Sequence, residues 1–144
     1  MHVICPGCQA VNRVSPDRAQ GAQPVCGKCK AALVPEASGF PVEVGDGDFE
    51  AQVKQAGVPV LVDFWGPSCP PCRQLEPVLK EFAKEMAGKL KVVKVNTEQC
   101  RRLPGDFAIR AVPTLILFRE GQEVARSSGF RPLHELRAFR SQTR

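Results

Sequence analysis

The sequence lacks the features by which several classes of protein are recognised. No apolar run in its 144 residues approaches the roughly 20 that a helix needs to cross a bilayer, so we expect no membrane partner. The first residues contain no basic stretch followed by an apolar segment, and no secretory signal is visible. A nucleotide-binding fingerprint is also missing. The lack of a membrane-spanning run and of a visible secretory signal favours a cytoplasmic location.

Cysteine, by contrast, is abundant, with seven residues. Without an export signal, a secreted disulfide scaffold is disfavoured, and cysteines in a reducing compartment are more often metal ligands or redox groups. The odd count means that at least one cysteine stands outside any set of pairs. The formal net charge of +5 is modest and needs no nucleic-acid partner to explain it.

Four of the cysteines form two closely spaced pairs near the N-terminus. Cys5 and Cys8 make the first pair, and Cys26 and Cys29 make the second. The pattern C-x2-C-x17-C-x2-C falls within the spacing typical of structural zinc sites. Two cysteines three residues apart on a tight turn place both sulfurs on one ion, and two such turns complete a tetrahedral site. We predict one structural zinc ion, with iron or an iron–sulfur centre, disulfides, or no metal as the alternatives.

The segment around these cysteines has few large apolar side chains. So short a piece does not bury enough surface to fold unaided, and metal binding would supply the missing folding free energy, roughly 10 kcal/mol or more. We expect a zinc-ribbon domain over residues 1–35, a linker over residues 36–41 and a second domain over residues 42–144.

The pattern from residue 42 onward alternates between strands and helices. Residues 58–65 form a near-continuous apolar run, as a central parallel strand requires, and residues 70–87 place apolar side chains on one helical face. Further strands are expected at residues 42–44, 90–95, 114–118 and 123–127. Further helices are expected from Asp46 or Asp48 to about Ala56, and at residues 98–107 and 132–140. This order predicts an α/β fold with a central mixed sheet flanked by helices.

A third Cys-x-x-Cys motif, Cys69-Pro70-Pro71-Cys72, follows the apolar strand and opens the long predicted helix. A motif at such a junction is a strong signal for thiol–disulfide chemistry. The helix N-terminus offers free amide N–H groups and partial positive charge, which favour a thiolate at Cys69. We expect Cys69 to be the nucleophile and Cys72 to resolve the mixed disulfide.

These residues and several others resemble the thioredoxin family. The matching segments are Val62-Asp63-Phe64-Trp65, Cys69-Pro70-Pro71-Cys72-Arg73, Pro77, Lys94-Val95-Asn96 and Val112-Pro113-Thr114. The resemblance covers about residues 42–142, and with its cysteine-rich N-terminus the chain is similar to the two-domain, zinc-containing bacterial thioredoxin 2 type. It implies a thioredoxin fold with a small N-terminal zinc ribbon.

The resemblance implies roles for two charged residues. Asp63 matches the family's buried aspartate beneath the disulfide. A carboxyl group in an apolar strand should have a raised pKa, so that it passes a proton to or from Cys72. Lys94 matches the lysine that neighbours this aspartate.

A substrate-binding surface is implied as well. Pro113 matches the family's cis-proline, which exposes the backbone of Val112 for pairing with an extended substrate segment. The other substrate-binding residues that the resemblance implies are Trp65, Pro70, Pro71 and Gly129.

Two positions depart from the family's pattern. The family's usual motif is Cys-Gly-Pro-Cys, but this chain has Pro70 in place of the glycine. The proline removes an amide donor near the thiolate and stiffens the turn. Ser68 stands where a large aromatic residue is expected, which removes apolar surface where partners dock. Partner preference is therefore less transferable than the chemistry.

The expected activity is reduction of disulfides in client proteins. The family implies thioredoxin reductase as the partner that restores the dithiol, and we expect a monomer. The alternative is a redox-sensing zinc-ribbon binding module or holdase. Few cations and aromatic residues accompany the N-terminal cysteines, so no nucleic-acid partner is expected.

The seventh cysteine, Cys100, lies beside Arg101 and Arg102, whose charges would lower its pKa. We interpret it as an incidental, partly exposed thiol, with a regulatory thiol as the alternative.

Overall fold

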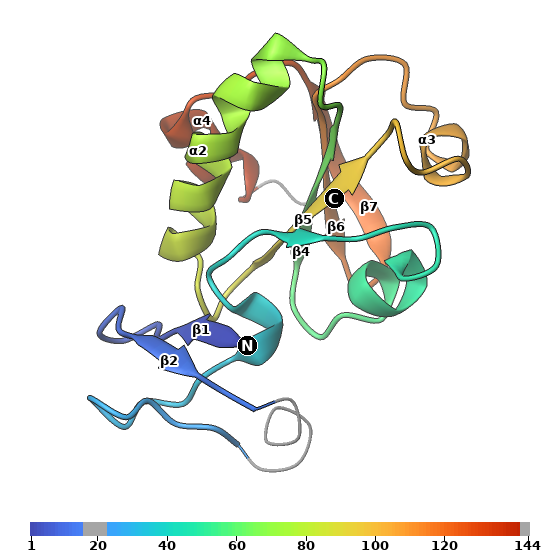
Figure 1. Cartoon of the computed structure of the whole chain (residues 1–144). Helices are drawn as coiled ribbons and strands as arrows, with labels where there is room; N and C mark the ends of the chain where they lie inside the picture. The colour runs from blue at the N-terminus through green and yellow to red at the C-terminus, as the bar shows by residue number, and fades with distance from the viewer. Residues whose placement is uncertain (16–22, 142–144) are drawn as a thin grey trace.

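A mixed sheet of five strands in the order β3-β5-β4-β6-β7 organises the larger part of the chain (Figure 1). The computed structural model describes residues 1–15 and 23–141, so residues 16–22 and 142–144 of the two expected domains lie outside the described residues. The strands are β3 (Val42–Glu43), β4 (Val60–Trp65), β5 (Lys91–Asn96), β6 (Thr114–Arg119) and β7 (Gln122–Ser128). Strand β4 is parallel to β5 and antiparallel to β6, so the predicted mixed sheet is confirmed.

Helical segments cover both faces of this sheet (Figure 1). Helices α2 (Pro70–Glu85) and α4 (Leu133–Phe139) pack against each other on one face. On the opposite face lie the short π-helical segment η2 (Glu50–Lys54) and helix α3 (Leu103–Asp106). Within the described residues, no helix is long and apolar enough to cross a membrane.

Strand β4 is buried on both faces, and its side chains alternate between the two layers. Val60, Val62 and Phe64 belong to the apolar cluster beneath α3. Leu61 belongs to the cluster beneath α2 and α4. Because strand side chains alternate, Asp63 points to the same side as Leu61, toward the helix that carries the Cys-x-x-Cys motif.

Two predicted helices are much shorter than expected. The segment expected to run from Asp46 or Asp48 to Ala56 contains only η2, and the one expected at residues 98–107 contains only α3. The Asp46 carboxylate does not cap its own segment, because it accepts hydrogen bonds from three backbone N–H groups at the start of α3. Pro104, in the first turn of α3, is favourable at the start of a helix, not in its interior.

The N-terminal part forms a hairpin that the sequence analysis did not predict. Strands β1 (His2–Ile4) and β2 (Val11–Arg13) pair antiparallel. Apolar side chains of this part gather in a cluster of their own, separate from the two clusters of the large sheet. The cluster contains Val3, Cys5, Val14, Cys26 and Leu33. It is small, as expected for a segment with few large apolar residues.

The expected linker is packed between the N-terminal hairpin and α2. It contains part of the 3-10 turn η1 (Pro35–Ala37), and Ala37 and Ser38 are buried. The N–H of Ile4 donates to the Ser38 carbonyl at 2.7 Å, and the N–H of Gly88 donates to the Ala37 carbonyl at 2.8 Å. The turn that ends α2 is thereby held against the N-terminal part.

We predict that Gly88→Ala destabilises the protein by about 2 kcal/mol or more. Gly88 has a φ of +82°, which disfavours L residues, and an added Cβ would lie 2.8 Å from Cβ of Pro6. Urea unfolding measures the loss. Gly45→Ala is the matched control, since nothing lies within 4 Å of the added Cβ. Equal stability of the two variants would contradict the prediction.

Candidate functional site

The motif after β4 holds a disulfide between Cys69 and Cys72, whose Cα atoms are 5.3 Å apart. Cys69 is the N-cap of α2 and is partly exposed, whereas Cys72 lies inside the first turn and is 4% exposed. The sulfur of Cys69 is therefore the one that an approaching protein reaches first. This geometry fits the predicted roles of attacking and resolving cysteine.

The first turn of α2 offers Cys69 one close amide. Pro70 and Pro71 occupy the first two helical positions and have no N–H group. The N–H of Cys72 donates to Cys69 Sγ at 3.2 Å. A thiolate at this atom is thus stabilised by that single N–H and by the partial positive charge of the helix end.

Side chains outside the motif hold the loop that precedes Cys69. The Glu98 carboxylate accepts hydrogen bonds from the Ser68 N–H at 3.3 Å and the Ser68 hydroxyl at 2.9 Å. The Arg73 guanidinium donates to the Pro67 carbonyl at 3.0 Å and 3.2 Å. Sequence reasoning missed Glu98, because 30 residues separate it from Ser68.

The loop before β6 brings a second backbone segment to the disulfide. The Val112–Pro113 peptide bond is cis, as the family resemblance implies. The Val112 carbonyl oxygen lies 3.5 Å from Cys69 Sγ, and the N–H of Gly129 donates to the Pro113 carbonyl at 2.8 Å. Of the residues implied for substrate binding, Val112 therefore lies beside Cys69, Pro113 is next to Val112 in the chain, and Gly129 is joined to Pro113 by a hydrogen bond.

The Asp63 carboxyl group is buried in the sheet, with 1% exposure. Its Oδ1 atom has no hydrogen-bond partner among the described residues. Burial raises the pKa of Asp63 to about 7, the positive charge of Lys94 opposes this rise, and the charges of Glu43 and Glu76 add to it. Asp63 can therefore hold and release a proton near neutral pH.

Lys94 is the register partner of Asp63 on the neighbouring strand β5. Its ammonium lies 4.2 Å from the centre of the Trp65 ring. The same ammonium is 3.8 Å from the Glu43 carboxylate and 3.7 Å from the Glu76 carboxylate. The structure thus brings Trp65 and Lys94 together, and it adds two carboxylates that sequence reasoning missed.

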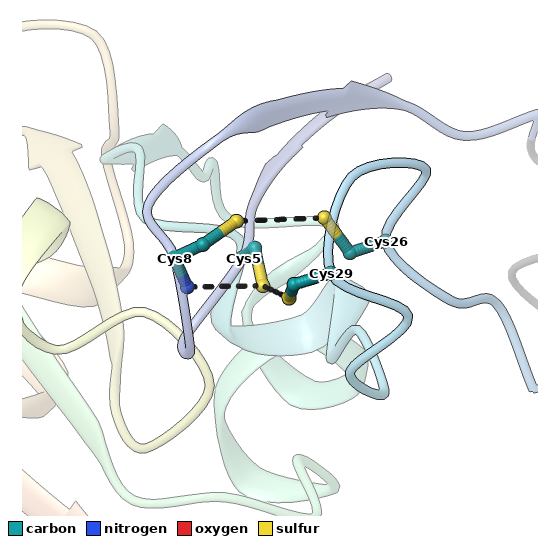
Figure 2. A group of neighbouring side chains, drawn as sticks. All are labelled: Cys5, Cys8, Cys26 and Cys29. Carbon is teal, nitrogen blue, oxygen red and sulfur yellow. Dashed lines mark hydrogen bonds between the residues drawn. The ribbon is translucent and has the colours of Figure 1, made fainter.

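The four N-terminal cysteines gather their sulfur atoms in one place (Figure 2). All four lie within 4.8 Å of one another, with Cys5 Sγ 3.5 Å from Cys29 Sγ and Cys8 Sγ 3.7 Å from Cys26 Sγ. Four sulfurs around one zinc ion at the usual 2.3 Å would be roughly 3.8 Å apart. These four cysteines can therefore hold a metal ion.

Amide donors surround the first sulfur of each pair. The N–H groups of Gly7 and Cys8 donate to Cys5 Sγ at 3.3 Å and 3.5 Å. Backbone N–H groups, with that of Cys29 as the strongest influence, lower the pKa of Cys26 to about 6. The pKa of Cys29, by contrast, is raised to about 11, although the Ala31 N–H acts to lower it, because the neighbouring cysteine sulfurs and burial disfavour its thiolate. The first sulfur of each pair is thus the one most readily ionised.

Asn12 joins strand β2 to the second cysteine turn, and the sequence analysis missed it. Its amide Nδ2 donates to Cys26 Sγ at 3.5 Å, and its Oδ1 accepts from the Gly27 N–H at 2.9 Å. Asn12 lies on β2, which pairs with β1 in the hairpin that was not predicted.

Comparison with known proteins shows which family this chain belongs to. Residues 40–142 match the thioredoxin family model. A thioredoxin of Haemophilus influenzae is 43% identical over 101 residues, which cover 70% of this chain and 94% of that protein. Thioredoxin C-3 of Corynebacterium nephridii is 36% identical over 129 residues, which cover 90% of this chain and 86% of that protein. The chain belongs to the thioredoxin family.

Membership of the thioredoxin family settles the fold class and the class of reaction. The sheet with helices on both faces is a thioredoxin domain, and the protein is a thiol–disulfide oxidoreductase. The thioredoxin family implies substrates that carry disulfides and thioredoxin reductase as a partner.

The interpretation of Cys100 is wrong in one respect. Cys100 is buried in the apolar cluster beneath α3, not partly exposed. Burial raises the pKa of its thiol, and the negative charge of Asp46 adds to this rise. The neighbouring arginines therefore do not lower its pKa, and the thiol is protonated at neutral pH.

We predict that Asp63→Asn removes a pH dependence of stability. The pKa of Asp63 is raised from 3.8 to about 7 in the folded state, so between these pH values the folded state binds more protons than the unfolded state. The free energy of unfolding of the wild type therefore falls by roughly 4 kcal/mol as the pH rises through this range. The variant should have little advantage below about pH 4 and its full advantage above about pH 7. Urea unfolding of the oxidised proteins across this range is the measurement. A stability difference between variant and wild type that stays constant across this pH range would contradict the prediction.

Proposed function

We propose that the chain reduces disulfides of client proteins through Cys69 and Cys72. The observation that carries the proposal is the placement of Cys69 Sγ: partly exposed, at a helix start, and 3.2 Å from the Cys72 N–H. A thiolate at this position is stabilised without being sealed from a partner.

In the first step, the Cys69 thiolate attacks one sulfur of the client disulfide. The client S–S bond breaks, a mixed disulfide forms with Cys69, and the second client sulfur leaves as a thiolate that takes a proton from solvent. The Val112 carbonyl oxygen, 3.5 Å from Cys69 Sγ, places the backbone before β6 beside the point of attack.

In the second step, Cys72 loses its proton and attacks Cys69 Sγ. The Asp63 carboxylate accepts the proton, because its pKa of about 7 makes it a suitable base at neutral pH. The mixed disulfide breaks, the other client sulfur leaves and is protonated, and the Cys69–Cys72 disulfide forms. Two electrons have passed from the dithiol to the client.

We propose that the client lies as an extended segment across the surface beside Cys69. The backbone of Val112 pairs with it, and Pro113 and Gly129 support this segment through their hydrogen bond of 2.8 Å. The other contact residues are Trp65, Pro70 and Pro71. Ser68 in place of a large aromatic residue narrows the apolar part of this surface.

We also propose that residues 1–35 are a zinc ribbon attached to a thioredoxin domain at residues 42–144, as in the bacterial thioredoxin 2 type. Cys5, Cys8, Cys26 and Cys29 would hold one structural zinc ion. When bound, the ion cross-links the two cysteine turns and supplies stability that the small cluster there does not. The proposal includes a cytoplasmic monomer with no nucleic-acid partner.

We predict that Cys69→Ser lowers insulin-disulfide reduction to the uncatalysed background, because it removes the partly exposed sulfur at the start of α2. Cys72→Ser should instead accumulate a mixed disulfide with the client, visible by non-reducing electrophoresis and mass spectrometry. Cys100→Ser, which removes a buried thiol outside the motif, is the matched control and should keep the wild-type rate. An active Cys69→Ser variant would sink the proposed function.

We predict one zinc ion per chain by elemental analysis, and its loss in Cys26→Ser. That variant should unfold at lower urea concentration in its N-terminal part, because one of four ligands is gone. It should still reduce insulin if the metal is structural. Cys100→Ser should keep the ion. Iron in place of zinc, or full metal content in Cys26→Ser, would contradict this assignment.

A further inference from the structure

Lys94 lies between two acidic side chains that come from different elements. Glu43 is its register partner on the edge strand β3, and Glu76 reaches it from the second turn of α2. The two carboxylates are 3.8 Å and 3.7 Å from Lys94 Nζ. We refer to Glu43 and Glu76 as the carboxylate pair.

The alternation of strand side chains explains this convergence. Val44 and Val93 belong to the cluster beneath α3, so their neighbours Glu43 and Lys94 point to the other face. That is the face on which Asp63 is buried and which α2 covers. Glu43, Lys94 and Asp63 therefore lie on one face of the sheet, beneath the helix α2 that carries Glu76.

A pocket of about 490 Å³ gives solvent access to this layer. Glu43, Glu76 and Lys94 line it, and Phe40 and Pro41 of the expected linker form another part of its wall. The Lys94 side chain is 11% exposed, whereas the two carboxylates are about half exposed. Exposure thus decreases from the two glutamates to Lys94 and then to the buried Asp63.

We propose that Glu43 and Glu76 are positioning residues for the disulfide exchange, which hold the Lys94 ammonium from two sides and so limit its attraction for the buried carboxyl beneath the disulfide. This inference rests on the proposed function, since it concerns the base that serves Cys72. It assigns residues that do not touch the reacting sulfurs.

Two effects of the carboxylate pair act in the same direction. Each negative charge disfavours ionisation of Asp63 directly, and each competes with Asp63 for the charge of Lys94. The same two acids contribute to the raised pKa of Asp63. Neutralising either one should therefore make Asp63 a weaker base.

Three charged groups of the described residues act on the Asp63 carboxyl group. They are Lys94 on β5, Glu43 on β3 and Glu76 on α2. On β6 its register partner is the apolar Leu115, which contributes no charge. Lys80 does not pair with Lys94 or Asp63 but with Glu76, since its ammonium lies 3.9 Å from the Glu76 carboxylate.

The test is the titration of Asp63 in the oxidised, metal-loaded full chain, followed by carboxyl-carbon NMR with ¹³C-labelled aspartate. Asp63→Asn identifies the signal. We expect Glu76→Gln and Glu43→Gln each to shift the titration midpoint to lower pH, and the double variant to shift it further. The rate of insulin reduction should also depend on the ionisation of Asp63, and that part of the pH–rate profile should shift to lower pH in the same variants.

Glu81→Gln is the matched control, because Glu81 lies on the same helix and lines the same pocket but is not one of the ion-pair partners of Lys94 among the described residues. It should leave the midpoint in place. Glu76→Asp, which keeps the charge, should stay nearer to wild type than Glu76→Gln. If Glu76→Gln does not fold, Glu43→Gln on the exposed edge strand tests the same effect.

An unchanged or raised midpoint in Glu76→Gln or Glu43→Gln would overturn the inference, and so would an equal shift in Glu81→Gln. The proposed function fails separately, through an active Cys69→Ser variant. An active wild type with an unmoved midpoint in both glutamine variants would therefore remove the positioning role alone.

Discussion

The structure depends on the burial of strand β4 between two layers of helices. An apolar strand with neighbours on both sides and helices on both faces has one register and one orientation for each side chain. That constraint sends Asp63 into the layer under α2 and sends Val62 and Phe64 into the other. Because α2 begins directly after Cys69, the same constraint places the Asp63 carboxyl group in the layer covered by the helix that carries the disulfide.

The chemistry at this point depends on a division between exposed and buried groups. Cys69 is partly exposed and close to the N–H of Cys72, whereas Cys72 and Asp63 are buried. Exposure lets a partner reach one sulfur, and burial raises the pKa of the carboxyl group to about 7. The disulfide thus joins a sulfur that a partner can reach to a buried one, in a domain that also buries a carboxyl group whose pKa is about 7.

The N-terminal part solves a different problem. Its apolar cluster is small, and its four converging sulfurs can hold a metal ion, which would cross-link the two cysteine turns. Backbone hydrogen bonds join Ile4 to Ser38 and Ala37 to Gly88, in the turn that ends α2, and Pro6 lies close to Gly88. These contacts place the cysteine turns at the end of α2 that lies opposite the redox motif.

The carboxylate pair adds a layer of control around Lys94. A lysine beside a buried aspartate favours its ionised form, and two nearby acids weaken that influence. Because Glu43 and Glu76 are about half exposed, substitutions there act on the site through charge, with little loss of core packing.

The sequence by itself determined the sheet strands, the long helix, the Cys-x-x-Cys chemistry and the spacing of the four cysteines. Hydrophobic periodicity and motif spacing are local properties, which is why they sufficed for residues 58–65 and for Cys69 and Cys72. Tertiary structure decided what depends on distant partners: the capping of α3 by Asp46, the burial of Cys100 and the joining of Glu43 and Glu76 at one lysine. Those contacts exist only once strand register and helix placement bring separate segments together, and no local pattern encodes them.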